Sequence, residues 1–287
     1  MSQRNLESTE QRNPRSRHID TMTSLEIVHL INREDQKVAR AVAKEANRIA
    51  RIIDQVVEAL KLGGRVFYIG AGTSGRLGVL DATEMPPTFG VSSKTFQGVI
   101  AGGWKALRMS VERAEDDQLS IGRELKRRGL CESDVLIGLS ASGKTPFVLA
   151  AMRVAKQIGA RCFGITCSQN PKMASLADET VVLRVGPEAV AGSSRMKCGT
   201  GQKMVLNAIS TGSMIRLGRV YEGLMIDMQP KSRKLKRRAV LIISEIARVD
   251  KATAERALRK ARGNIRRAIL SLGSGIVNRP KPESKKK

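Results

Sequence analysis

The chain has 287 residues, of which 41% are hydrophobic, enough for one large α/β domain with a small appendage. Its 51 Lys and Arg residues against 27 Asp and Glu give a net charge of +24, which raises nucleic-acid binding as a hypothesis. Only 3% of the residues are aromatic, so stacking platforms are scarce. We therefore expect no nucleic-acid partner beyond weak, non-specific charge binding.

The numbers and positions of the cysteines and histidines argue against two classes of site, metal sites and histidine triads. The four cysteines form no C-x-x-C pair and lie in or beside apolar runs, so we expect buried, reduced thiols and no metal site. Two histidines, both near the N-terminus, argue against a histidine triad. A polar N-terminus and the lack of an apolar run of about 18 residues predict a cytoplasmic protein without a membrane partner.

The predicted elements begin with a polar arm over 1–20 and helices over 23–42 and 45–60. Strands and helices then alternate to about residue 218, which is typical of a parallel sheet covered by helices. Runs rich in β-branched residues mark five strands, at 65–70, 94–103, 134–139, 161–167 and 180–185. The last part of the chain is predicted to be helical, at 195–218, 234–249, 251–261 and 264–272.

We expect three parts in this α/β chain. These are an N-terminal arm with helices over 1–54, a sheet domain over 55–218 and a helical C-terminal region over 219–287. The basic run KSRKLKRR (231–238) has helical spacing and is interpreted as a solvated face. The run KPESKKK (281–287) is interpreted as a disordered basic tail.

Two loops carry phosphate-binding patterns. GAGTSG (70–75) fits the dinucleotide fingerprint, and GLSASGKT (138–145) fits the phosphate loop of ATPases. No carboxylate lies in 94–103 to hold a ribose, and no later strand ends in Asp or Glu for a metal. We therefore interpret the two loops together as a site for one phosphorylated small molecule.

Hydroxyl groups and backbone N–H groups are the expected phosphate ligands. A loop that enters a helix presents unpaired N–H groups and the positive end of the helix dipole. The candidate binding residues are Thr73, Ser74, Ser140, Ser142 and Thr145. The alternative is that these Gly and Ser residues only make tight turns and cap helices.

Two glutamates are the candidate proton carriers. Glu84 lies in LDATEMPP (80–87), where Pro86 and Pro87 are predicted to end the helix and apolar neighbours are expected to raise the pKa of Glu84. Glu115 lies in the acidic run VERAEDD (111–117). The alternatives are a carboxylate on a helix surface and a solvated acidic turn.

The chain resembles the N-acetylmuramic acid 6-phosphate etherases, enzymes of the sugar-isomerase (SIS) type. The resemblance rests on long blocks spread over about residues 5–275, namely TEQRNP (9–14), IDTMTSLEIV (19–28), YIGAGTSGRLGVLDATEMPPTFG (68–90), VIAGG (99–103), RAEDD (113–117), GLSASGKTP (138–146) and GSSRMKCGTGQKMVLNAISTGSMIRLG (192–218). The related glucokinase regulatory protein shares the fold but is a binder of sugar phosphates, which leaves a non-enzymatic regulator as the alternative.

The resemblance implies an SIS sugar-phosphate domain over 55–218 and a lyase that needs no cofactor. The implied reaction splits the lactyl ether by elimination and water addition, giving N-acetylglucosamine 6-phosphate and D-lactate. It implies Glu84 as proton donor, Glu115 as its acid/base partner, and Ser140, Ser142 and Thr145 as phosphate ligands. It also implies a homodimer. Which glutamate takes the C2 proton stays open.

Four residues depart from the family pattern. The family usually has Ser and Cys where this chain has Thr83 and Met85, and Arg where it has Lys144. It usually has Gly at Arg113, two residues before Glu115. A bulky cation there is expected either to lower the pKa of Glu115 or to crowd the site.

Overall fold

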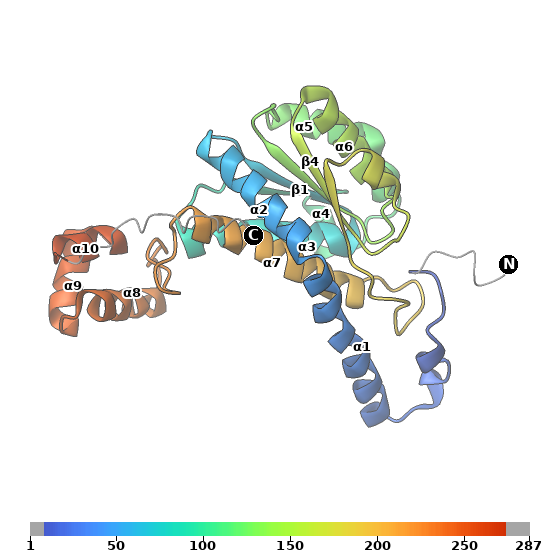
Figure 1. The fold of residues 1–287 in the computed structure, drawn as a ribbon, viewed down its shortest axis with the longest axis horizontal. Coiled ribbons are helices and arrows are strands. Elements are labelled where there is room, and N and C mark those ends of the chain that lie inside the picture. The colour runs from blue at the N-terminus through green and yellow to red at the C-terminus, as the bar shows by residue number, and fades with distance from the viewer. Residues whose placement is uncertain (1–8, 274–287) are drawn as a thin grey trace, which may run out of the picture. The chain divides into compact units, whose positions relative to one another are not determined.

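The computed structural model describes residues 9–273 and divides into two compact units (Figure 1). The first unit comprises the chain up to Thr83 together with Ser93–Ser213. The second comprises Glu84–Ser92 and the chain from Met214 onward. The KPESKKK tail (281–287) lies outside the described residues.

The elements of the first unit are mostly strands alternating with helices. Two helices precede the sheet, α1 (Ser24–Lys44) and α2 (Ala46–Lys61). The strands are β1 (Val66–Gly70), β2 (Phe96–Ile100), β3 (Val135–Leu139), β4 (Arg161–Thr166) and β5 (Glu179–Val182). The helices among and after the strands are α3 (Gly72–Phe89), α4 (Lys105–Arg108), α5 (Gln118–Arg127), α6 (Pro146–Ile158) and α7 (Lys197–Arg216).

All five strands pair in parallel, in the order β2-β1-β3-β4-β5. The first strand, β1, therefore lies in the interior of the sheet. The chain then passes to the edge strand β2 and returns across β1 to β3. Such an order has a topological switch point between β1 and β3, where loops leave the sheet in opposite directions. The predicted α/β class with a parallel sheet is confirmed.

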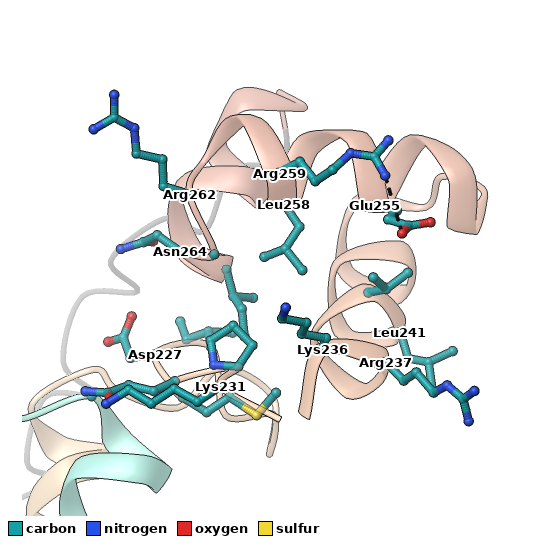
Figure 2. A pocket seen from close by; sticks show the side chains of 18 of the residues that line it. Asp227, Lys231, Lys236, Arg237, Leu241, Glu255, Leu258, Arg259, Arg262 and Asn264 are labelled. Atoms are coloured by element: carbon teal, nitrogen blue, oxygen red, sulfur yellow. Dashed lines mark ion pairs between the residues drawn. The ribbon is translucent and has the colours of Figure 1, made fainter. Parts of the chain in front are cut away.

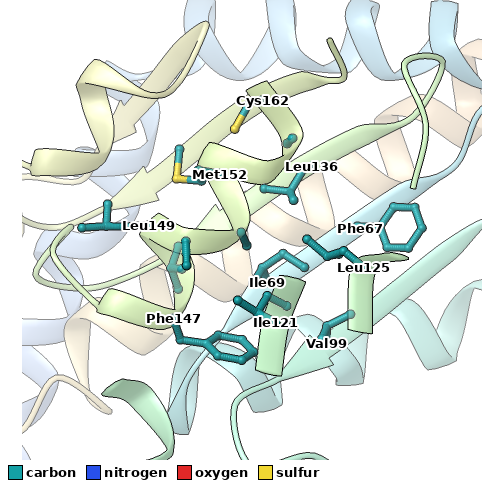
Figure 3. Close-up of a cluster of buried hydrophobic side chains, with 14 of the residues drawn as sticks. Phe67, Ile69, Val99, Ile121, Leu125, Leu136, Phe147, Leu149, Met152 and Cys162 are labelled. Atoms are coloured by element: carbon teal, nitrogen blue, oxygen red, sulfur yellow. The ribbon is translucent and has the colours of Figure 1, made fainter. Parts of the chain in front are cut away.

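The core of the first unit lies on both faces of the sheet. On one face, Phe67, Ile69 and Leu136 pack against α5 and α6 (Figure 3). On the other face, Gly78 of α3 lies 3.0 Å from the Cβ of Tyr68, measured from the position that a glycine Cβ would take. The strands are buried on both sides, as parallel strands require.

The second unit contains the end of α3 and a bundle of three helices, α8 (Arg233–Ala247), α9 (Lys251–Lys260) and α10 (Ile265–Ser271). Each helix begins at a capping side chain, Ser232, Asp250 and Asn264 respectively, which accepts a hydrogen bond from an N–H group in the first turn. Ile242, Leu258 and Ile269 belong to its apolar core. The predicted helical appendage is confirmed.

Two local expectations are wrong. Helix α3 does not end at Pro86 and Pro87 but runs through both to Phe89. A proline ring has a helical φ angle, and the Pro86 and Pro87 carbonyls still accept hydrogen bonds, from the N–H groups of Gly90 and Gln229. Cys131 is exposed, whereas the other three cysteines are buried as expected.

The buried carboxylate of Asp81 on α3 generates a testable prediction. Its Oδ1 accepts hydrogen bonds from Asn207 Nδ2 at 2.7 Å and Ser210 Oγ at 3.1 Å, both on α7. Burial raises the pKa of Asp81, and these hydrogen bonds offset the effect only in part. The folded state therefore loses stability as the pH rises from about 4 through the raised pKa.

Replacement of Asp81 with Asn keeps the Oδ1 acceptor and removes the negative charge that the carboxylate carries at higher pH. We expect Asp81→Asn to gain stability over the wild type as the pH rises from about 4 through the raised pKa of Asp81, in urea unfolding followed at several pH values. Asp116→Asn, at an exposed position, serves as the control. A difference that does not change with pH would contradict the prediction.

Candidate functional site

The two predicted phosphate-binding segments leave the sheet side by side, but the one predicted as a loop over 70–75 is a loop only at Ala71 and is helical from Gly72 onward. In the register of β1 and β3, Gly70 lies opposite Leu139, so both strands end at the same level. The segment from Ala71 into α3 follows β1, and Ser140–Thr145 follows β3. The carboxyl edge at a switch point is the usual ligand-binding position of open α/β sheets.

Three hydroxyl groups converge in the loop after β3. Ser140 Oγ lies 2.8 Å from Thr145 Oγ1 and 3.4 Å from Ser142 Oγ. Ser140 is buried and also accepts a hydrogen bond from the Gly143 N–H at 2.9 Å, while Ser142 and Thr145 are partly exposed. The structure thus brings together the three hydroxyls that the sequence predicted, at the amino end of α6.

Gly143 is required by the shape of this loop. Its φ angle is +68°, and a Cβ there would lie 2.3 Å from Pro171 Cβ. Lys144, the residue that makes the loop resemble an ATPase phosphate loop, is exposed. Pro146 takes the first position of α6, where its missing N–H costs no helical hydrogen bond.

The first turn of α3, which follows β1, is held by α7. Ser74 Oγ donates a hydrogen bond to Gln202 Oε1 at 2.8 Å. Gln202 is 1% exposed, and its Nε2 has no partner among the described residues. Thr73 is partly exposed, and its Cγ2 approaches Gly199 of α7. Gln202 is thus a site residue that the sequence reasoning missed, because no motif marks it.

The amino end of α7 contains a buried network that sequence reasoning also missed. Lys197 Nζ lies 2.6 Å from Glu34 Oε2, and both residues are 1% exposed. Glu188 accepts hydrogen bonds from the N–H groups of Lys197 and Cys198 at 3.0 and 2.9 Å. Burial opposes ionisation of Glu34, but its hydrogen bonds with Lys197 and Lys37 outweigh burial and lower the pKa of Glu34 to about 2.

The two candidate glutamates are both exposed. Glu84 lies on α3, ten residues after Ser74, and Leu80 one turn before it is half-exposed. Met85 and Phe89 are buried, but they do not enclose the Glu84 side chain. Glu115 lies in a short 3-10 turn, Ala114–Asp116. Glu84 belongs to the second unit and Glu115 to the first.

Arg113 adopts a left-handed backbone conformation next to Glu115. Its φ and ψ angles are 60° and 0°, and its side chain is exposed. This region favours glycine because it brings Cβ close to the backbone. The residue that departs from the family pattern therefore sits where the backbone itself favours Gly.

The described residues hold no helix long and apolar enough to cross a membrane. They also hold no cluster of three or more His, Cys, Asp or Glu side chains suited to a metal ion. The segments after β1 and β3 offer hydroxyl and backbone N–H groups, and these groups suit an anion.

Comparison with known proteins agrees with this geometry. Residues 48–156 match the glucokinase regulatory protein N-terminal SIS domain, and residues 127–211 match the SIS domain. The chain is 48% identical, over 265 residues, to the N-acetylmuramic acid 6-phosphate etherase of Geobacillus sp. (strain WCH70), covering 92% of this chain and 90% of that protein.

Two solved structures share the fold at low sequence identity. One is a phosphoheptose isomerase from Neisseria gonorrhoeae, at 18% identity and a TM-score of 0.51, covering 67% of this chain and 98% of the other. The second is the Vibrio vulnificus NanR protein complexed with ManNAc-6P, at 16% identity and a TM-score of 0.51, covering 70% of this chain and 67% of the other.

The left-handed conformation of Arg113 gives a prediction about stability. Arg113→Gly removes the Cβ that disfavours this conformation, so we expect a gain of about 0.5–1 kcal/mol in the free energy of unfolding. Glu112→Gly, at an exposed neighbour without a positive φ angle, should lose stability because glycine gains entropy in the unfolded chain. Urea unfolding measures both, and equal effects would contradict the argument.

Proposed function

The chain belongs to the family of N-acetylmuramic acid 6-phosphate etherases, and we propose that it performs this lyase reaction with Glu84 and Glu115 as its proton-transfer residues. It cleaves the lactyl ether of N-acetylmuramic acid 6-phosphate and releases N-acetylglucosamine 6-phosphate and D-lactate. The observation that carries this proposal is the convergence of three hydroxyl groups at the switch point of the sheet, in a chain nearly half identical to named etherases.

The loops bind the 6-phosphate of the sugar. Ser142 and Thr145 donate hydrogen bonds to the phosphate oxygens, and the amino end of α6 contributes N–H groups and its dipole. Thr73 in the first turn of α3 donates in the same way, and Ser74 beside it contributes when its hydroxyl turns from Gln202 to the phosphate. Ser140 both contacts the phosphate and holds the loop, because the Gly143 N–H already binds its oxygen. Support comes from the related fold of the NanR protein, which was solved with ManNAc-6P.

The two glutamates move the protons of the elimination. The C2 hydrogen becomes acidic when the ring opens to the C1 aldehyde, and one carboxylate removes it. The other carboxyl group protonates the ether oxygen as the bond to C3 breaks, which releases D-lactate. Water then adds to C3 with the proton transfers reversed. A non-enzymatic regulator would need neither proton carrier, and the etherase names of the relatives favour the enzyme.

A second copy of the chain completes the site in our proposal. Both glutamates are exposed in the single chain, and a general acid needs partial desolvation to stay protonated near neutral pH. The first unit also exposes four large apolar side chains that we expect a partner copy to cover in part, namely Leu80, Trp104, Met109 and Leu119, all at least half-exposed. We expect a cytoplasmic homodimer, which sedimentation would detect; a monomer at micromolar concentration would contradict it.

The role of the glutamates is tested by isosteric replacement. Glu84→Gln and Glu115→Gln each keep the shape and lose the transferable proton, so kcat should fall roughly 10²–10⁴-fold while KM changes little. Release of D-lactate measures turnover. Glu112→Gln, in the same acidic run as Glu115, is the matched control and should stay near wild type. Near-normal turnover of either variant would refute the pairing.

The phosphate loop is tested by removing single hydroxyls. Ser142→Ala deletes one donor to a charged group, which costs about 1.5–3 kcal/mol of binding, or roughly tenfold or more in affinity. The loss should be seen for the phosphorylated sugar in calorimetry and be absent for the unphosphorylated sugar. Ser140→Ala should in addition lower the unfolding free energy, since Ser140 is buried and bonds Gly143. Equal losses of affinity for both sugars would show that the phosphate does not bind at this loop.

A further inference from the structure

The second unit contains a large basic pocket that the proposed reaction does not use. It has a volume of about 1310 Å³ and is formed between α8, α9, the start of α10 and the segment that precedes α8. Figure 2 shows Lys236 and Leu258 pointing into its open space. All of its lining residues belong to the second unit, so it forms without the sugar-phosphate loops.

The pocket is rich in cations that no described carboxylate neutralises. Its two acidic residues are both engaged: Asp227 pairs with Arg266 at 2.8 Å, and Glu255 pairs with Arg259 at 3.4 Å. Six further lining cations form no ion pair with any residue that the structure describes, namely Lys231, Arg233, Lys236, Arg237, Lys251 and Arg262. Between residues 214 and 273 the chain has sixteen Lys and Arg against five Asp and Glu.

Apolar side chains line the same pocket beneath the cations. Ile226, Met228 and Leu258 contribute buried surface, and Leu241 of α8 remains 51% exposed at the rim. A ligand that fits must therefore carry apolar groups as well as negative charge. The volume exceeds the roughly 300–1,000 Å³ that is usual for small-molecule sites, which favours a segment of a macromolecule.

We propose that this pocket binds an acidic, amphipathic segment of another protein. Such a segment places its apolar residues on the floor of the pocket and its carboxylates against the six cations that pair with no described carboxylate, as amphipathic helices do in grooves. None of the described lining residues is aromatic, so nucleic-acid bases would find no stacking surface.

The chain itself does not supply the occupant. A second copy has a net charge of +24, which opposes docking into a basic pocket. The residues after 273 contain five basic residues and one acidic residue, the wrong sign for this site. Charge complementarity thus calls for a separate acidic partner.

A synthetic peptide tests the proposal with the full-length protein. The labelled peptide has about 15 residues, roughly four helical turns, with Leu on one face and Glu on the rest. Fluorescence anisotropy should show saturable binding that weakens with salt. A peptide of the same composition in scrambled order should bind at least about tenfold more weakly, because the apolar face is lost.

Matched variants on α8 distinguish peptide binding in the pocket from general attraction to the basic surface. Lys236→Gln with Arg237→Gln removes two lining cations, whereas Lys234→Gln with Arg238→Gln removes two exposed cations of the same helix outside the lining. The first pair should weaken peptide binding about tenfold and the second less than about threefold. Leu241→Ser should likewise weaken binding more than Leu270→Ser, which changes an equally exposed leucine outside the pocket.

Several outcomes would overturn the proposal. Equal effects of the two charge pairs would reduce the binding to general electrostatics. Equal binding of the scrambled peptide, or no binding, would remove the amphipathic segment as the occupant. Displacement of the peptide by single-stranded DNA of the same charge, with loss of DNA binding in the Lys236 and Arg237 variant, would assign the pocket to nucleic acid instead.

Discussion

Parallel pairing of β1 with β3 places Gly70 opposite Leu139, so two loops of separate βα units leave the sheet side by side. The register is fixed at the other end of the strands. The carboxylate of Asp134, 1% exposed, accepts hydrogen bonds from the Arg65 backbone N–H at 2.8 Å and from its guanidinium at 2.7 Å. A shift by one residue would break these bonds and turn buried side chains toward the wrong face.

The second support of the site is α7, which contacts the first turn of α3 through Gly199 and Gln202. Its amino end is anchored by the buried pair of Lys197 with Glu34 and by the Glu188 carboxylate at its first N–H groups. Removal of one partner from a buried ion pair leaves the other charge buried and uncompensated. Such pairs therefore fix the positions of the helices that carry them more than they add net stability. Through this anchor, Gln202 is held where it accepts the hydrogen bond of Ser74.

Much of the fold could be predicted from sequence, because strands buried on both faces leave uninterrupted apolar runs and amphipathic helices leave a periodic pattern. The convergence of Ser140, Ser142 and Thr145 was also predictable, since loop residues after one strand stay close. The residues at which helices end were harder to predict. The two prolines predict that α3 ends there, but the helix continues to Phe89, since a proline lacks only the N–H donor and the Pro86 carbonyl still accepts the helical hydrogen bond of the Gly90 N–H.

Contacts between distant residues were not predictable in this way. Glu34 and Lys197 are 163 residues apart, and nothing local marks either as buried. The basic run 231–238 was interpreted as a solvated face, and its basic side chains are exposed, yet several of them line a pocket that the packing of α8 on α9 creates. The catalytic roles of Glu84 and Glu115 and the three-part domain division stay predictions.

The reaction itself is tested most directly by isotope labelling. The wild-type chain is incubated with N-acetylmuramic acid 6-phosphate in water enriched in oxygen-18 and deuterium, and both products are analysed by mass spectrometry. Elimination followed by water addition predicts oxygen-18 at C3 and deuterium at C2 of the sugar product, with D-lactate that keeps the unlabelled ether oxygen. Oxygen-18 in the lactate hydroxyl, or no lactate at all, would contradict the assignment.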